Sequence, residues 1–280
     1  MRACNFVGIL AAALLAVLLS DHATAATIPF VEDFDDNAAP DFTYSATTAN
    51  ITPVVGGGVL TIDHTLGAST QAINALVNIS GANGVPIVMD TDITPTIWHT
   101  AGGNSGGFLA FSTNPALGAF PSGANSGYLA DIVLPTNTSA GFIRIFNNAT
   151  ATTIIDSSAS PFAAGSLALN ETYHLTFTAT PAGLGLVNLS LTLTDTAGTF
   201  IDGDGIVTIS TLAPVAESTG TFFGYRHRVG SNGTSGTRTL DAVYDNFSIS
   251  AVPEPNSFVL IGMAAIMFGR ICERKRKLTT

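Results

Sequence analysis

Apolar and polar residues alternate strictly in two neighbouring segments near the middle of the chain, residues 171–180 and 186–194. The apolar face of the first segment carries Tyr173, Leu175, Phe177 and Ala179. The apolar face of the second carries Val187, Leu189, Leu191 and Leu193. Because successive side chains of a β-strand point to opposite faces, this alternation predicts two strands that are each buried on one face. Residues 181–185 form a loop of hairpin length, so the pattern predicts an antiparallel hairpin.

Short runs rich in β-branched and aromatic residues recur along most of the chain, bounded by Gly, Pro, Asn and Ser. Clear examples are residues 58–63, 86–93, 107–112 and 141–146. About a dozen such runs occur between the chain ends, where no segment keeps a helical period or forms an internal repeat. The pattern predicts an all-β domain, a double-sheet antiparallel β-sandwich of the jelly-roll type.

Both ends of the chain depart from this pattern. An apolar run at residues 6–19, followed by small residues at 23–25, is typical of a signal peptide that ends at residue 25. A second apolar run covers residues 258–272, and as a helix its 15 residues would rise only roughly 22 Å. That is short of the roughly 30 Å hydrocarbon core of a bilayer. The basic cluster within residues 270–277 predicts that this end stays on the cytoplasmic side.

A proline-bounded motif, Pro253, Glu254 and Pro255, stands before the second apolar run and is expected to be extended. The order of motif, apolar run and basic cluster resembles the PEP-CTERM sorting signal of Gram-negative bacteria, although Cys272 and Glu273 inside the cluster depart from that pattern. The resemblance covers residues 252–277. It implies transient membrane insertion, processing by an exosortase that recognises the motif, and export to the cell surface or an exopolysaccharide matrix. A plain C-terminal anchor is the alternative.

These ends divide the chain into a signal peptide (1–25), a sandwich ectodomain (26–251) and a sorting signal (252–280). The ectodomain has four arginines, no lysine and 17 acidic residues, which gives a net charge of −13. Such a charge excludes nucleic acid as a partner, because nucleic-acid binding relies on many cationic contacts. Cys4 and Cys272 both lie outside the ectodomain, so a disulfide framework or a Cys–zinc site is excluded there.

A second resemblance spans the ectodomain. Its start at residues 30–36, the strand at 172–175 and its end at 240–249 look like concanavalin A-like (laminin-G-type) jelly rolls. The resemblance implies that the first and last strands are adjacent, which would bring Phe34 and Phe247 together in the core. That family hosts lectins, carbohydrate-binding modules, glycosidases and adhesive domains, so the fold alone selects no function.

One segment, residues 103–107, fits the G-x-S-x-G pattern of serine hydrolases. That motif needs a strand before the serine and a helix after it, whereas here an apolar strand follows, and we interpret the segment as a flexible loop. Retaining glycosidases need two carboxylates roughly 5 Å apart. The E-x-D-x-E triplet that supplies them in jelly-roll glycosidases is absent from the sequence. The sequence therefore favours a protein that is not an enzyme.

Acidic side chains gather at both ends of the ectodomain. Asp33, Asp35 and Asp36 follow the first predicted strand, and Asp245 lies in the last one. If these strands are neighbours, the carboxylates could share a structural Ca2+, which takes six to eight oxygen ligands. Solvated turn residues are the alternative interpretation.

Trp98 and Tyr128 are the aromatic candidates for ligand binding, because rings on exposed loops of a sandwich can stack on sugars. A lone tryptophan in a sandwich is alternatively a core residue. Alternation also places Arg226 and Arg228 on one face of a strand, with Tyr225 and His227 on the other. In so acidic a domain, these arginines either contact an anionic glycan or pair with internal acids.

The sequence thus predicts an exported, non-catalytic bacterial surface or exopolysaccharide-matrix protein with a structural, adhesive or glycan-binding role. The expected partners are the exosortase and an extracellular polysaccharide, and a structural Ca2+ is the one cofactor expected. A secreted carbohydrate-active enzyme of glycoside hydrolase type is the alternative.

Overall fold

The computed structural model describes most of the ectodomain. The described residues are 28–46, 53–66, 71–79, 82, 84–98, 104–114, 116, 126–134, 141–158, 169–195, 207–214, 218–229 and 238–252. Thr27–Ala251 form one compact unit, and its described part consists of strands and turns without a helix. No helix in these ranges is long and apolar enough to cross a membrane. The predicted signal peptide, the motif at 253–255 and the apolar run behind it lie outside the described residues.

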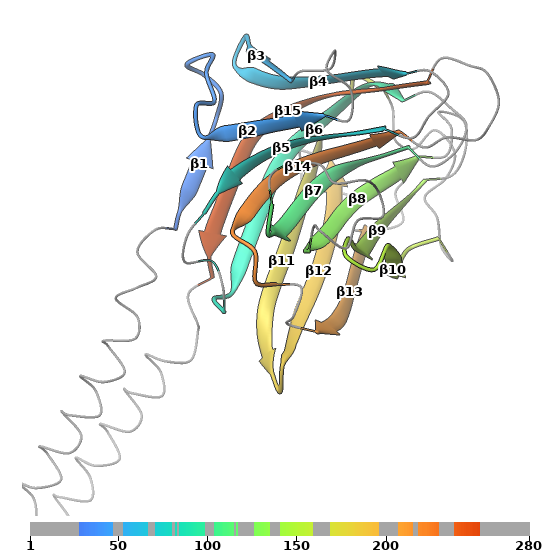
Figure 1. Cartoon of the computed structure of the whole chain (residues 1–280). Coiled ribbons are helices and arrows are strands. Elements are labelled where there is room, and N and C mark those ends of the chain that lie inside the picture. Colours follow the sequence, from blue (N-terminus) through green and yellow to red (C-terminus); the bar gives the residue numbers. More distant parts are fainter. Residues whose placement is uncertain are drawn as a thin grey trace, which may run out of the picture. The chain divides into compact units, whose positions relative to one another are not determined.

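Two antiparallel sheets lie face to face (Figure 1). The eight-stranded sheet has the order β13 (Val207–Pro214), β12 (Leu186–Asp195), β11 (Tyr173–Gly183), β6 (Ile87–Trp98), β15 (Arg238–Ala251), β4 (Val59–Leu66) and β3 (Val54–Gly56), and β1 (Phe30–Glu32) also pairs with β15. The seven-stranded sheet has the order β10 (Thr152–Asp156), β9 (Phe142–Asn147), β8 (Tyr128–Leu134), β7 (Asn104–Ser112), β14 (Phe222–Val229), β5 (Gln71–Asn78) and β2 (Phe42–Ala46). The predicted all-β double-sheet sandwich is confirmed for the described residues.

The predicted hairpin is β11 with β12, and all eight apolar residues predicted to face inward are buried. The connection is tighter than expected, because the strands continue to Gly183 and Leu186. Leu184 and Gly185 then form a two-residue turn with φ of 54° and 74°. Positive φ at both central positions is the geometry that matches the right-handed twist of hairpin strands.

The first and last strands are adjacent, as the resemblance to concanavalin A-like folds implies. β1 pairs with β15 through Glu32 opposite Phe247. Phe34 and Phe247 are both fully buried in one core cluster, where Phe42 stands between them with ring centroids 6.0 Å and 5.5 Å away. This aromatic cluster joins the two sheets, because Phe42 belongs to β2 of the seven-stranded sheet.

The segment at 103–107 is not the loop that its glycines suggest, since β7 begins at Asn104. A Cβ atom on Gly107 would lie 2.4 Å from the carbonyl oxygen of Ala130 in β8. A Cβ atom on Gly106 would lie 3.2 Å from the hydroxyl of Tyr244 on the inner side. The glycines therefore permit close packing of a central strand, and the prediction of a loop was wrong.

Candidate functional site

A transverse row of mostly polar residues crosses the outer face of the seven-stranded sheet, the face turned away from the core. Residues directly opposite one another on neighbouring strands make up this row, which we name the arginine row: Ser45, Asn74, Arg226, Gly107, Asp131, Arg144 and Asp156. Neighbouring strands lie about 4.8 Å apart, so side chains in the row can contact each other.

Alternation along β14 places the arginines on this face, as predicted. Tyr225 and His227 are fully buried between the sheets, where Tyr225 bonds to Thr91 at 2.7 Å and His227 bonds to the hydroxyl of Tyr244. Arg226 must then point to the opposite side. One face of β14 thus packs in the core, and the other face carries the side chains of Arg226 and Arg228.

Arg144 and Asp131 form a bidentate ion pair within the row. Nε of Arg144 donates to Oδ1 of Asp131 at 2.9 Å, and Nη2 donates to Oδ2 at 2.7 Å. The Arg144 guanidinium also lies 4.9 Å from the centroid of the Phe146 ring. Burial alone would lower the pKa of Arg144, but the Asp131 carboxylate raises it above the usual range. This is the strong geometry of charge-assisted pairing, and it engages both oxygens of Asp131.

Arg226 has a different environment. Its Nη1 donates to Oδ1 of Asn148 at 2.8 Å, a neutral acceptor, and the residue is only 4% exposed. Burial, together with the positive charge of Arg228, lowers the pKa of Arg226 to about 10, against the opposing attraction of Asp131. Burial also lowers the pKa of Arg228, and the charge of Arg144 adds to this effect. Positive charge therefore accumulates on this face.

Asn74 lies directly opposite Arg226 in the row. Its neighbours Ile73 and Ala75 belong to the core cluster, so the Asn74 side chain points to the outer face. It is fully buried, and neither its amide nitrogen nor its amide oxygen has a hydrogen-bond partner among the described residues. Buried polar groups in native proteins are nearly always hydrogen-bonded, so this amide marks a position where a partner is expected.

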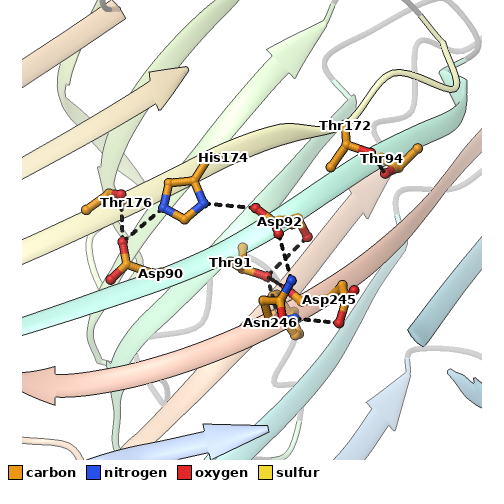
Figure 2. Close-up of polar contacts among 10 residues, drawn as sticks. Asp90, Thr91, Asp92, Thr94, Thr172, His174, Thr176, Asp245 and Asn246 are labelled. Atoms are coloured by element: carbon orange, nitrogen blue, oxygen red, sulfur yellow. Dashed lines mark hydrogen bonds and ion pairs between the residues drawn. The ribbon is translucent and has the colours of Figure 1, made fainter. Parts of the chain in front are cut away.

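A second polar cluster lies on the outer face of the eight-stranded sheet, where His174 sits between Asp90 and Asp92 (Figure 2). Nδ1 of His174 is 2.9 Å from Asp92, and Nε2 is 3.4 Å from Asp90. The hydrogen bond to Asp90 raises the pKa of His174 to about 9, against the effect of burial and with Asp92 adding to it. Burial alone would raise the pKa of Asp90, but the hydrogen bonds from His174 and Thr176 lower it below the usual value.

The carboxylate–histidine cluster, Asp90, Asp92 and His174, extends toward the last strand. Asn246, at a register shift in β15 and with a φ of 54°, donates from Nδ2 to Asp92 at 2.8 Å (Figure 2). Asp245 bonds to the backbone N–H of Asn246 at 2.7 Å. Every polar member thus has a partner inside the chain, which is the arrangement of a structural ion-pair network.

Three of the four residues predicted to bind calcium, Asp33, Asp35 and Asp245, come close enough to influence one another electrostatically. Burial raises the pKa of Asp245, and the negative charges of Asp92, Asp35 and Asp33 contribute to that rise. Asp33 and Asp36 accept hydrogen bonds from backbone N–H groups two residues onward, as turn residues do. In the described part of the chain no three His, Cys, Asp or Glu side chains converge on a metal position. The calcium site stays a prediction, and a calcium-selective rise in melting temperature would test it.

The two aromatic residues predicted to bind a ligand, Tyr128 and Trp98, both lie in strands. Tyr128 was expected on an exposed loop, but it begins β8, is fully buried in the core and donates to the carbonyl of Pro214 at 2.5 Å. Tyr128 as a ligand-binding residue is therefore wrong, because the strand starts at this position and turns the ring inward. Trp98 ends β6 opposite Leu240, and only its backbone position is described.

Sequence reasoning found Arg226 and Arg228 but missed their surroundings. Asn74, Asp131 and Arg144 come from strands far away in the chain, and only the sheet order brings them to β14. The carboxylate–histidine cluster had a usable signal, since Asp90 and Asp92 stand two apart in an apolar run and must share a face.

Comparison with protein-family models and with curated proteins gives no match. Among solved structures, lectin II from Ulex europaeus has a TM-score of 0.50 and 13% identity, over 81% of this chain and 99% of the lectin. Lectin UEA-II complexed with galactose has a TM-score of 0.50 and 12% identity, over 80% and 98% of the two chains. An endo-β-1,4-glucuronan lyase from the fungus Trichoderma reesei has a TM-score of 0.44 and 12% identity, over 80% and 95%. The two lectin matches show that the fold is a lectin-like sandwich, and at these identities they show nothing more.

Proposed function

We propose that this chain is an exported, non-catalytic carbohydrate-binding protein of a bacterial surface or extracellular matrix. The glycan binds on the outer face of the seven-stranded sheet, and residues 253–255 direct sorting. The observation that carries the proposal is the chemistry of this outer face: three of the four ectodomain arginines, Arg144 and Arg226 of the arginine row and Arg228 beside it, gather there in a domain with a net charge of −13. The lectin-like sandwich supports the same class of function by analogy of fold.

The arginine row suits recognition because it combines charge with directional donors. Guanidinium groups hold planar acceptors in a fixed fork geometry, and the Asn74 amide offers both a donor and an acceptor beside them. Sugars present hydroxyl and ring oxygens that pair with such groups. In an acidic protein, a face on which arginines gather also directs negatively charged partners to one place.

The carboxylate–histidine cluster is the one observation that favours the alternative of a carbohydrate-active enzyme. Asp90 and Asp92 share one face of β6, as the two carboxylates of a glycosidase do. A general acid needs a raised pKa, however, whereas that of Asp90 is lowered by His174 and Thr176. A network in which each carboxylate is already engaged supports a structural role better than a catalytic one.

Export and sorting rest on the sequence of the two ends. The Pro253–Pro255 motif, the short apolar run and the basic cluster support processing at the membrane. Mass spectrometry of the mature surface protein is expected to find the C-terminal basic cluster removed. Recovery of peptides covering residues 270–277 from the surface protein would instead favour a permanent anchor.

Residues 27–251 are suitable for the binding experiment, because they contain both sheets and the complete core cluster within one compact unit. The purified unit should be applied to a glycan array of neutral and acidic polysaccharides, with a parallel assay for release of sugar or unsaturated products. Binding without product supports the proposal. Product formation would establish the enzymatic alternative, and neither binding nor product would contradict both.

A further inference from the structure

The apex of the β11–β12 hairpin combines two unfavourable features in one residue. Leu184 is fully exposed to solvent, and its backbone has a φ of 54°. Asn-Gly is the preferred pair in such a turn, because a bulky residue is strained at positive φ, yet here Leu184 precedes Gly185. An exposed leucine alone would be ordinary, but strained backbone is concentrated at functional positions. The apex is therefore a candidate contact surface.

The surroundings of the apex are apolar and uncharged. The hairpin lines a pocket of about 180 Å³, to which Val85 and Phe111 also contribute. The segments that reach this end of the sandwich, residues 84–89, 175–194 and 207–214, contain no charged residue, in a domain with a net charge of −13. Burying charged groups against an apolar phase is costly, so this end is the part of the domain best suited to contact one.

The last strand leaves the domain at the same end. β11 and β15 both pair antiparallel with β6, so they run in the same direction (Figure 1). Ala251 ends β15 opposite Ile87, which in turn lies opposite Ala179 of β11. Leu184 follows Ala179 by five residues, so the apex extends roughly 16 Å beyond the row in which β15 ends.

The sequence after Ala251 indicates what this end faces. The apolar run begins at Phe258, seven residues later, which is at most about 25 Å of extended chain. Whenever this run is inserted in a bilayer, the end of the sandwich that carries Leu184 is held within that distance of the lipid. The projection of the hairpin spans most of the gap. The tether therefore favours the bilayer over a second copy of the chain as the occupant of this surface.

We propose that the apex of the β11–β12 hairpin, with Leu184 at its tip, inserts into the phospholipid bilayer that receives the C-terminal apolar run. The inference rests on the membrane insertion proposed above for sorting and is independent of glycan binding. One leucine side chain buries too little apolar area to hold a domain at a membrane, so the contact depends on the tether. It orients the domain while residues 253–255 are processed, and it is lost when the tail is removed.

The test tethers residues 27–257 to phosphatidylcholine vesicles through a C-terminal histidine tag and a nickel-chelating lipid, which replace the apolar run. These residues contain no cysteine, so Ala182→Cys, at an exposed bulge beside Leu184, accepts a single environment-sensitive fluorophore. On tethering, its emission should shift to the blue, and brominated lipid should quench it.

Leu169→Cys is the matched position for the label at the opposite end of the sheet. Leu169 is also exposed, and the next residue, Asn170, donates its backbone N–H to the carbonyl of Pro95. Pro95 lies eight residues, or roughly 26 Å, along β6 from Ile87. A fluorophore at residue 169 should show neither the blue shift nor the quenching.

Leu184→Asn tests the tip itself. Because Asn-Gly suits this turn, the variant should keep or raise the melting temperature. The ratio of inserted to free tips, measured by quenching at residue 182, should fall at least about tenfold, the factor expected for loss of a buried leucine side chain.

No blue shift at residue 182, equal shifts at residues 182 and 169, or unchanged quenching in the Leu184→Asn variant would overturn the proposal. A blue shift that appears without vesicles and grows with protein concentration would assign the tip to a contact between copies, and would overturn it as well. These outcomes leave the proposed function untouched, because the array measures glycan binding and mass spectrometry measures removal of the tail.

Discussion

The outer faces of the two sheets follow the same alternation of side chains but differ in the residues that they carry and in how deeply these are buried. On the eight-stranded sheet the outer positions of β11 and β12 hold Thr, Ser, Asn and His side chains that are partly exposed. The His174 side chain, for example, is 39% exposed. On the seven-stranded sheet the outer face holds arginines and an apolar cluster, and Arg226 is 4% exposed.

The difference shows what burial does to similar ion pairs. Both faces contain a cation held by aspartates from a neighbouring strand. On the exposed face water screens the charges, and each pair is expected to contribute less than about 1 kcal/mol. On the buried face a lost partner leaves a charge that water cannot solvate. The exposed network is therefore a modest addition to stability, whereas the buried row constrains the fold more strongly.

The largest expected effect comes from breaking the buried pair. Asp131→Asn keeps the side-chain shape but removes the negative charge to which Arg144 donates two hydrogen bonds. Because the Arg144 side chain is 13% exposed and that of Asp131 is 4% exposed, we expect a loss of about 3–5 kcal/mol in the free energy of unfolding. Urea unfolding of residues 27–251 measures this loss in the free energy of unfolding.

The matched change on the other sheet is Asp92→Asn, which is expected to cost only about 0.2–1 kcal/mol because its partner His174 is well solvated. Similar losses for the two variants would contradict the contrast between the faces.

Gly107→Ala should be the next largest change. The added methyl group would lie 2.4 Å from the Ala130 carbonyl oxygen and 2.8 Å from Cα of Asp131, both backbone atoms that cannot move aside. A loss of about 1–3 kcal/mol is expected from this overpacking. Gly56→Ala at the edge of the other sheet meets nothing within 4 Å and should be nearly neutral. A neutral Gly107→Ala variant would mean that β7 and β8 are less closely packed than described.

The smallest effect is the pH dependence that His174 confers on the eight-stranded sheet. Hydrogen bonding to Asp90 raises the pKa of His174 from 6.5 to about 9 in the folded state. The folded protein therefore holds this proton more tightly than the unfolded chain. The resulting stability is fully present below about pH 6.5 and is lost as the pH rises through 9.

Because the side chain is partly exposed, the total change should stay below about 1 kcal/mol. The free energies of unfolding of the wild-type unit and of His174→Gln, measured against pH, should converge as the pH rises from 6.5 to above 9. Parallel curves over this range would show that the cluster does not hold the proton.

The sequence determines those features that depend on one strand at a time. Alternation placed Tyr173 and Leu191 in the core and Arg226 on the outer face, because a side chain's face depends only on its position within its own strand. The partners of Arg226 could not be predicted. Asn74 and Asp131 belong to strands more than 90 residues away, and their register is set by packing between sheets.

Two errors have related causes. Glycines at 106 and 107 suggested a loop, because their role is to admit Tyr244 and the β8 backbone, which are distant in sequence. Tyr128 was considered as a ring on an exposed loop, although its hydroxyl reaches Pro214 from inside the core. Both depended on contacts with other strands, either in the same sheet or across the sandwich, which composition alone does not encode.

The central claim is that a glycan binds the outer face of the seven-stranded sheet and leaves the outer face of the eight-stranded sheet unchanged. Residues 27–251 contain only four arginines and no lysine, so the side-chain Nε–H region of a nitrogen-15 NMR spectrum should hold just four signals. Titration with a glycan selected on the array is predicted to shift the signals of Arg226 and Arg228, and to leave those of Arg238 and the His174 ring unchanged. Shifts at His174, or at all four arginines equally, would contradict the account.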